Sequence, residues 1–110
     1  MNLPRSSLLA AALLVAAFPF PARGQDDDPV ALARDLVDIA RPRVDRGAYT
    51  DAIRDLQEAC TADPANVEAA LLLSRALFET GRSTEAVAAL EGRTDPRAVA
   101  TRAALLFHRG

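Results

Sequence analysis

Few side chains in this sequence are suited to chemistry. Cys60 is the only cysteine and His108 the only histidine among 110 residues. One histidine without a second ligand does not make a metal site, and there is no glycine-rich phosphate loop or nucleophile beside a base. Asp35 and Asp38 lie three residues apart, as paired acids would, but the arginines around them favour an ion-paired, solvated helix face. The sequence therefore predicts a non-enzymatic protein without metal or cofactor.

Cys60 allows two interpretations. In an oxidising compartment it could be a reactive thiol or pair between chains. Alternatively it is a small apolar side chain near a helix end, following Ala59, and no basic residue adjoins it in sequence. The second interpretation is favoured, and catalysis through Cys60 stays as an alternative that thiol titration would decide.

The first 24 residues differ from the rest of the chain. Arg5 precedes an uncharged apolar run, Leu8–Phe18, and PFPARGQ then supplies a proline and small residues. This layout is typical of a secretory signal peptide, here cleaved after Gly24. The run is shorter than the roughly 20 apolar residues of a membrane-spanning helix, so an uncleaved membrane anchor is the alternative. We expect an exported protein, periplasmic or secreted.

The charge balance limits the class of partner. Cleavage would remove Arg5 and Arg23 from 13 basic residues and none of 15 acidic ones, which leaves 11 against 15 and a net charge of −4. Residues 25–28 would form an acidic leader to a domain over 29–110. A nucleic-acid surface needs a basic excess, so we expect protein partners and no nucleic acid.

Beyond the leader, the sequence repeats at an interval of 34 residues. Gly47 aligns with Gly81, and the helix that follows each glycine aligns as well: Ala52 with Ala86, Ile53 with Val87, and Leu56 with Leu90. A fixed period of this length indicates stacked helical hairpins. Apolar spacing, Asp-Pro pairs and glycines together predict helices at about 29–46, 50–61, 64–80, 83–92 and 96–109.

Expected caps mark the ends of these helices. Asp28, Asp63 and Asp95 each precede a proline, so each is expected to cap the helix that follows it. Ser83 or Thr84 is expected to cap the fourth helix. Gly47 and Gly81 are expected to end a helix with positive φ.

At this point the chain resembles the tetratricopeptide repeat family. In the first unit the resemblance rests on Leu36, Ile39, Ala40, Gly47, Tyr49, Ala52, Ile53, Leu56, Ala59 and Pro64, and in the second on Ala70, Leu73, Ser74, Leu77, Gly81, Ala86, Val87 and Leu90. It implies an all-α, short right-handed solenoid of antiparallel hairpins, with about two units and one terminal helix. Together with the expected signal peptide, the resemblance suggests a bacterial envelope protein.

The resemblance also implies a binding face. First helices of stacked hairpins line the inner, concave face, and in similar chains peptides lie along it. Carried over by position, the candidates are Arg34, Val37, Arg41, Val44 and Asp45 in the first unit and Glu68, Leu71, Arg75, Phe78 and Glu79 in the second. The alternative is that these are ordinary solvent-facing helix residues. Phe78 argues against it, because an aromatic side chain there lies off the main apolar stripe.

The terminal helix, 96–109, stops where its partner helix should begin. Val99, Ala103 and Leu106 are expected to give it a buried face, yet to stay only partly covered, with Phe107, because no partner helix follows. An apolar strip of this kind tends to find a partner, so self-association through 96–110 is expected. The alternative is that the chain is an N-terminal fragment of a larger envelope protein whose activity lies downstream.

Overall fold

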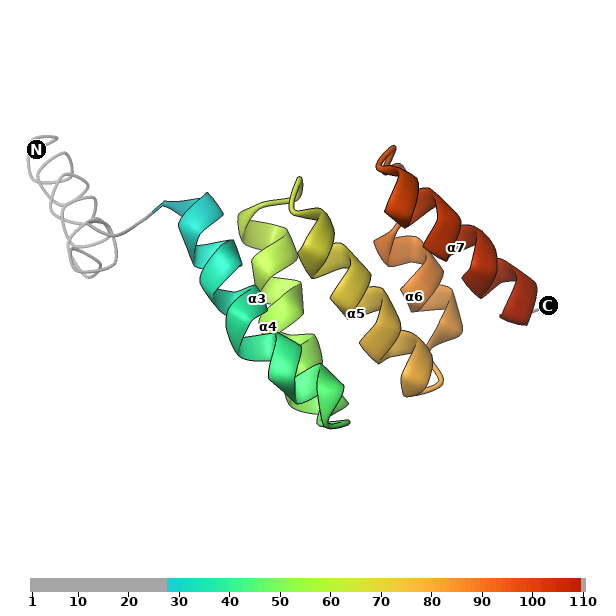
Figure 1. Ribbon diagram of the computed structural model, residues 1–110, viewed down its shortest axis with the longest axis horizontal. Coiled ribbons are helices and arrows are strands. Elements are labelled where there is room, and N and C mark those ends of the chain that lie inside the picture. Colours follow the sequence, from blue (N-terminus) through green and yellow to red (C-terminus); the bar gives the residue numbers. More distant parts are fainter. Residues whose placement is uncertain (1–27, 110) are drawn as a thin grey trace, which may run out of the picture.

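The computed structural model describes residues 28–109, which fold into helices joined by short turns. In chain order these are α3 (Pro29–Asp45), α4 (Tyr49–Ala62), α5 (Val67–Glu79), α6 (Ser83–Ala89) and α7 (Pro96–Arg109). Figure 1 shows α3, α5 and α7 side by side in one layer, with α4 and α6 in a second layer behind them. The predicted all-α repeat of helical hairpins is confirmed. The predicted signal peptide and its cleavage position lie outside the described residues.

The core lies between the two layers. Each helix of the first hairpin buries four residues. Those of α3 are Ala33, Val37, Ala40 and Val44, and those of α4 are Ala52, Ile53, Leu56 and Ala59. Alanine at half of these positions lets the two helices approach closely. Leu56 and its repeat partner Leu90 are both almost fully buried, and each such burial contributes roughly 1.5–3 kcal/mol.

The middle helix α5 is buried on two sides, because it contacts α3 and α4 on one side and α6 and α7 on the other. Even its Ser74 is fully buried, and the hydroxyl donates to the Leu71 carbonyl at 2.8 Å. No helix of residues 28–109 is both long enough and apolar enough to cross a membrane.

Gly47 and Gly81 end the first helix of each hairpin as predicted, with φ of 83° and 85°. After α5, the Gly81 N–H donates to the Phe78 carbonyl and the Arg82 N–H to the Leu77 carbonyl. This is the paired hydrogen bonding of a glycine-terminated helix. It turns the chain at once into the second helix.

The predicted start of α5 is wrong. Asp28 and Asp95 do accept backbone N–H bonds at the starts of α3 and α7, but α5 begins at Val67, with Asn66 as its cap. Asp63 instead closes a tight turn through Pro64, in which its carbonyl accepts the Asn66 N–H at 3.0 Å. Asn66 is as good a cap as aspartate, and starting the helix there leaves room for the chain to reverse after α4.

The predicted extent and cap of α6 are also wrong. The helix stops at Ala89 instead of 92, and its N-cap position is Arg82, with Ser83 already inside the helix. Gly92, at φ of 78°, lies in the turn that follows. Because Pro96 lies only six positions after Leu90, the chain has to leave the helix early to reach α7.

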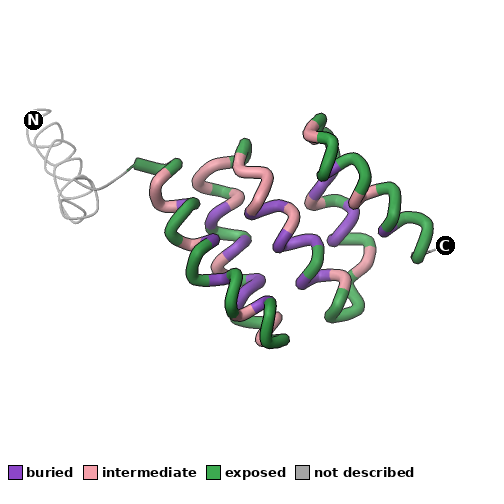
Figure 2. Tube along the Cα trace, viewed as in Figure 1, coloured by how far each residue is buried: buried purple, intermediate pink, exposed green. Residues whose placement is uncertain are grey.

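The predicted buried face of α7 is wrong as well. Within residues 96–108, Ala98 and Leu105 are the buried ones, at 0% and 8% exposure, whereas Val99, Ala103 and Leu106 are exposed. Figure 2 shows α7 as largely exposed at the end of the stack. The buried stripe faces α5 and α6, which are the neighbours that α7 contacts. The expected apolar strip therefore exists and lies on the side away from them.

Candidate peptide-binding face

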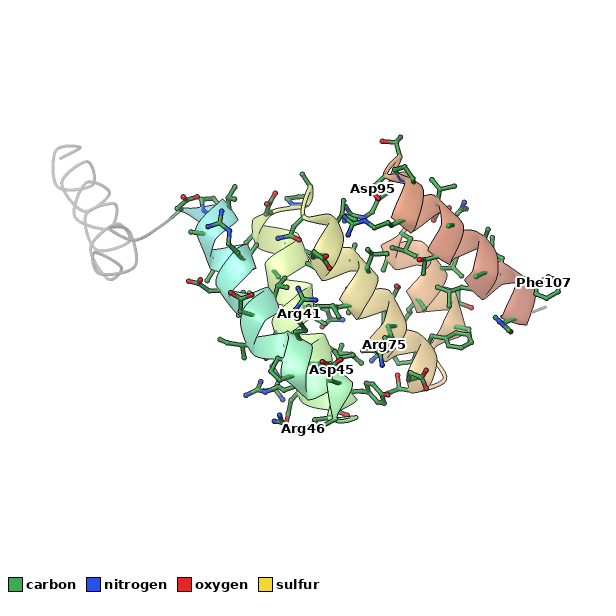
Figure 3. The ribbon with its side chains drawn as sticks, viewed as in Figure 1. Arg41, Asp45, Arg46, Arg75, Asp95 and Phe107 are labelled. Atoms are coloured by element: carbon green, nitrogen blue, oxygen red, sulfur yellow. The ribbon has the colours of Figure 1, made fainter. Side chains whose placement is uncertain are left out.

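The candidate site is the exposed surface of the layer formed by the first helices α3, α5 and α7, which is the inner face predicted from the sequence. Of the predicted residues, Arg34, Arg41, Asp45, Arg75 and Glu79 are exposed, and Glu68, Leu71 and Phe78 are half-buried. Figure 3 shows Arg41 and Asp45 on α3 opposite Arg75 on α5. Eight of the ten predicted side chains are therefore accessible to a ligand.

Val37 and Val44 are the exceptions, and predicting them as binding residues was wrong. They are 4% and 0% exposed. Their repeat equivalents Leu71 and Phe78 are half-buried, so equivalent positions of the two first helices differ in burial. The helix α3 packs closely on α4 through the stripe that contains both valines, and transfer by sequence position cannot detect this difference.

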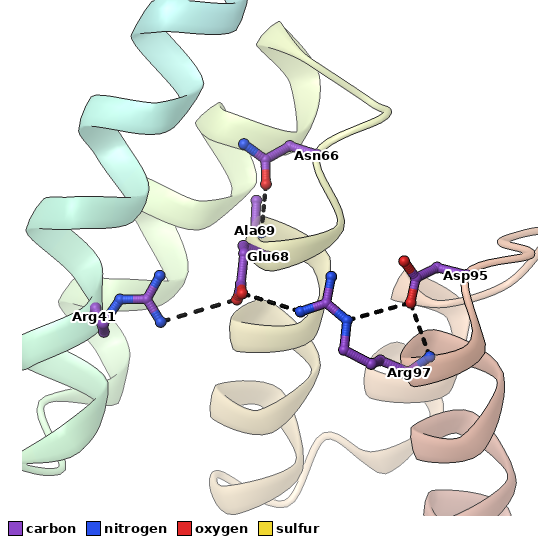
Figure 4. Close-up of polar contacts among 6 residues, drawn as sticks. All are labelled: Arg41, Asn66, Glu68, Ala69, Asp95 and Arg97. Atoms are coloured by element: carbon purple, nitrogen blue, oxygen red, sulfur yellow. Dashed lines mark hydrogen bonds and ion pairs between the residues drawn. The ribbon is translucent and has the colours of Figure 1, made fainter.

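Ion pairs join the first helices across this face. The Glu68 carboxylate on α5 lies 3.9 Å from Arg41 of α3 and 3.2 Å from Arg97 of α7. One carboxylate thus bridges two neighbouring helices, as Figure 4 shows. A second pair, Asp45 with Arg75 at 3.7 Å, joins α3 to α5. All these side chains are about half exposed, so each pair is worth at most about 1 kcal/mol and leaves its groups open to a competing ligand.

Arg97 is a residue of this face that the sequence did not reveal. It lies 29 residues after Glu68, not 34, so the repeat interval does not point to it. Its position is set by Asp95, whose carboxylate accepts the Arg97 backbone N–H at 2.8 Å and Nε at 3.4 Å. The backbone hydrogen bond, more than the guanidinium, lowers the pKa of Asp95 below its ordinary value. The Asp95-Pro96 pair was the available signal, since a capping aspartate orients the residues of the first turn.

The apolar part of the face comes from Leu71 and Phe78 on α5. Both pack against the core on one side and are partly accessible on the other. The Phe78 ring lies with its centroid 6.5 Å from that of His108 on α7, in a tilted arrangement. His108 itself is exposed. An apolar patch thus adjoins the charged pairs.

Cys60 does not have the environment of a reactive thiol. It is half-buried against the core, and this burial raises the pKa of the thiol, while Arg93 only partly opposes the shift. A raised pKa lowers the fraction of thiolate, the nucleophilic form. Among residues 28–109, no three His, Cys, Asp or Glu side chains are grouped so as to hold a metal ion.

A hollow of about 600 Å³ lies between two loops of the protein. The turn between α4 and α5 and the loop between α6 and α7 line it, through Pro64, Ala65, Val67, Glu91, Gly92, Arg93, Thr94 and Asp95. It is open to solvent, and none of the predicted binding residues lines it. It therefore forms no part of the candidate face.

Comparison with known proteins agrees with the stacked hairpins. A family model described as "Tetratricopeptide repeat" matches residues 43–106, more than half of the chain. No curated protein and no solved structure matches the chain.

Proposed function

This chain belongs to the tetratricopeptide repeat family, and we propose that it is an exported, non-catalytic scaffold that binds a protein segment along its inner face. Tetratricopeptide repeats are typically protein-interaction modules without catalytic activity. The inner face is the exposed surface of α3, α5 and α7 that carries Arg41, Asp45, Glu68, Arg75 and Arg97 with Leu71 and Phe78. Export and the choice of this face are the specific parts of the proposal.

The single observation that carries the proposal is the bridging of three first helices by half-exposed ion pairs beside an apolar patch. Pairs of this strength exchange readily with a ligand's charged groups. Phe78 and Leu71 offer an anchor for one apolar side chain, and aromatic anchors contribute much of the energy of peptide interfaces. The expected ligand is an extended segment with an apolar residue flanked by charged residues.

A peptide library displayed on phage tests the proposed face. The full chain is expressed with its own N-terminal residues 1–24, and the purified product is used for selection. A selected peptide is then synthesised, and its affinity is measured by fluorescence anisotropy. The variant Arg75→Glu reverses a charge on the inner face. The control Arg54→Glu makes the same change on α4, where Arg54 is 75% exposed and pairs with nearby Asp51.

We expect Arg75→Glu to weaken binding by about tenfold or more, equivalent to about 1.4 kcal/mol. The control should change the affinity less than about twofold, because Arg54 lies on α4 outside the inner face and surface substitutions away from a site have small effects. Equal weakening by both variants, or failure to select any peptide that depends on Arg75, would count against the inner face as the site.

Export is tested separately. The apolar run Leu8–Phe18 and the small residues up to Gly24 support cleavage near Gln25. N-terminal sequencing of the exported protein should begin at or within a few residues of Gln25. A product that still carries Leu8–Phe18 would favour the membrane-anchored alternative.

A further inference from the structure

The uncovered side of α7 is the strongest feature that peptide binding leaves unexplained. Residues of α7 repeat those of α5 at an interval of 29: Ala69 and Ala98 are both fully buried, and Ala76 and Leu105 are both buried. The next pairs diverge. Ala70 and Leu77 are buried at 0% and 3%, whereas Val99 and Leu106 are 52% and 38% exposed. The exposed strip is thus the side that α5, with neighbours on both sides, buries.

We propose that a second copy of this chain covers the strip, through antiparallel packing of the two α7 helices about a two-fold axis at Ala103. The strip consists of Val99, Ala100, Ala103, Leu106 and Phe107, all exposed. This proposal does not depend on peptide binding by the inner face.

The spacing of the strip is self-complementary. Val99 and Phe107 lie four residues on either side of Ala103, and Ala100 and Leu106 lie three on either side. An antiparallel two-fold pair sets position 103 + k against 103 − k, so Phe107 meets Val99 of the second copy and Leu106 meets Ala100. In both of these pairs a larger side chain meets a smaller one, and alanine facing alanine at the axis lets the helices approach closely. Antiparallel helices also align their dipoles favourably.

The charges beside the axis are complementary too. Arg102 adjoins Ala103 in sequence and pairs with Glu91 at 3.6 Å, and the two side chains are 40% and 65% exposed. A two-fold axis at Ala103 brings this pair next to its copy. Each Glu91 then lies near both arginines, in a ring of alternating charge around the axis.

The area of the strip indicates how strong the association is. Phe107 is 83% exposed, and a phenylalanine side chain covers roughly 150–250 Å². With Val99, Leu106 and the alanines, each copy offers about 400 Å², so a pair buries on the order of 800 Å². Stable interfaces bury at least about 1,200 Å². The dimer is therefore weak and depends on concentration.

Sedimentation equilibrium of the purified full-chain product tests the association. Between roughly 10 µM and roughly 1 mM, the apparent mass should rise towards twice that of the monomer. Ala103→Glu sets two carboxylates against each other at the axis and should hold the mass at the monomer value. Ala104→Glu is the matched control, since it changes another exposed alanine of the same helix beside the strip. Circular dichroism confirms that both variants are folded.

The orientation is tested by disulfide cross-linking in a Cys60→Ala background. Ala103→Cys should cross-link to itself. Val99→Cys should cross-link with Phe107→Cys when the two variants are mixed, at a yield severalfold above that of either alone. Self-linking of Val99→Cys and Phe107→Cys instead of the mixed product would overturn the antiparallel arrangement. A wild-type chain that stays monomeric at 1 mM, or equal disruption by Ala104→Glu, would overturn the dimer itself.

Discussion

Replacing Gly81 by alanine should destabilise the protein by about 1 kcal/mol, and the whole effect should come from the backbone. Gly81 has a φ of 85°, and a Cβ built there meets no atom within 4 Å. The left-handed conformation costs an alanine about 1–2 kcal/mol. Alanine also lowers the conformational entropy of the unfolded chain, which offsets about 0.4–1 kcal/mol of this loss in folding stability. The balance is a loss of about 1 kcal/mol, or a fall in melting temperature of about 4–8 °C for a domain of this size.

Urea unfolding followed by circular dichroism at 222 nm measures this loss. The matched control is Gly81→Asn, because asparagine adopts positive φ more readily than alanine and has the same open space around its Cβ. We expect the asparagine variant to lose less stability than the alanine variant. All variants carry Ala103→Glu as well, so that the proposed self-association through α7 does not contribute to the measured stability. An alanine variant as stable as the parent, or an asparagine variant that loses as much, would refute the backbone argument.

Three further predictions follow from single contacts. Asn66→Ala should destabilise by about 1 kcal/mol in urea unfolding, because the Asn66 side chain accepts the Ala69 N–H at 2.9 Å; no loss would contradict its role as cap. A double-mutant cycle on Arg43 and Asp55, which pair between α3 and α4, should give a coupling of about 1 kcal/mol that weakens in salt; zero coupling in low salt would contradict it. Cys60 should react with iodoacetamide more slowly in the native protein than in urea at the same pH, since burial raises its pKa; faster native alkylation would be evidence for an activated thiol.

The sequence alone determined the architecture, because the signals for it are local. Glycine is the residue that ends a helix at positive φ without strain, so Gly47 and Gly81 could be located without coordinates. Apolar spacing along each helix and the interval of 34 residues likewise predicted α3 and α4 to within a residue or so. The sequence also predicted which helices are the first helices of their hairpins, since repeated positions share a helix and a layer.

Tertiary packing decided the rest, because burial depends on which neighbours a helix has. Ile39 and Leu73 occupy equivalent repeat positions, yet Ile39 is 48% exposed and Leu73 only 7%. No described helix packs on the side of α3 that faces away from α5, whereas α5 has α3 and α4 on one side and α6 and α7 on the other. The same dependence on neighbours buries Val37, which packs on α4, and leaves Val99 exposed on α7. A sequence pattern shows which side chains share a stripe, but only the placement of the neighbouring helices decides which stripe loses contact with water.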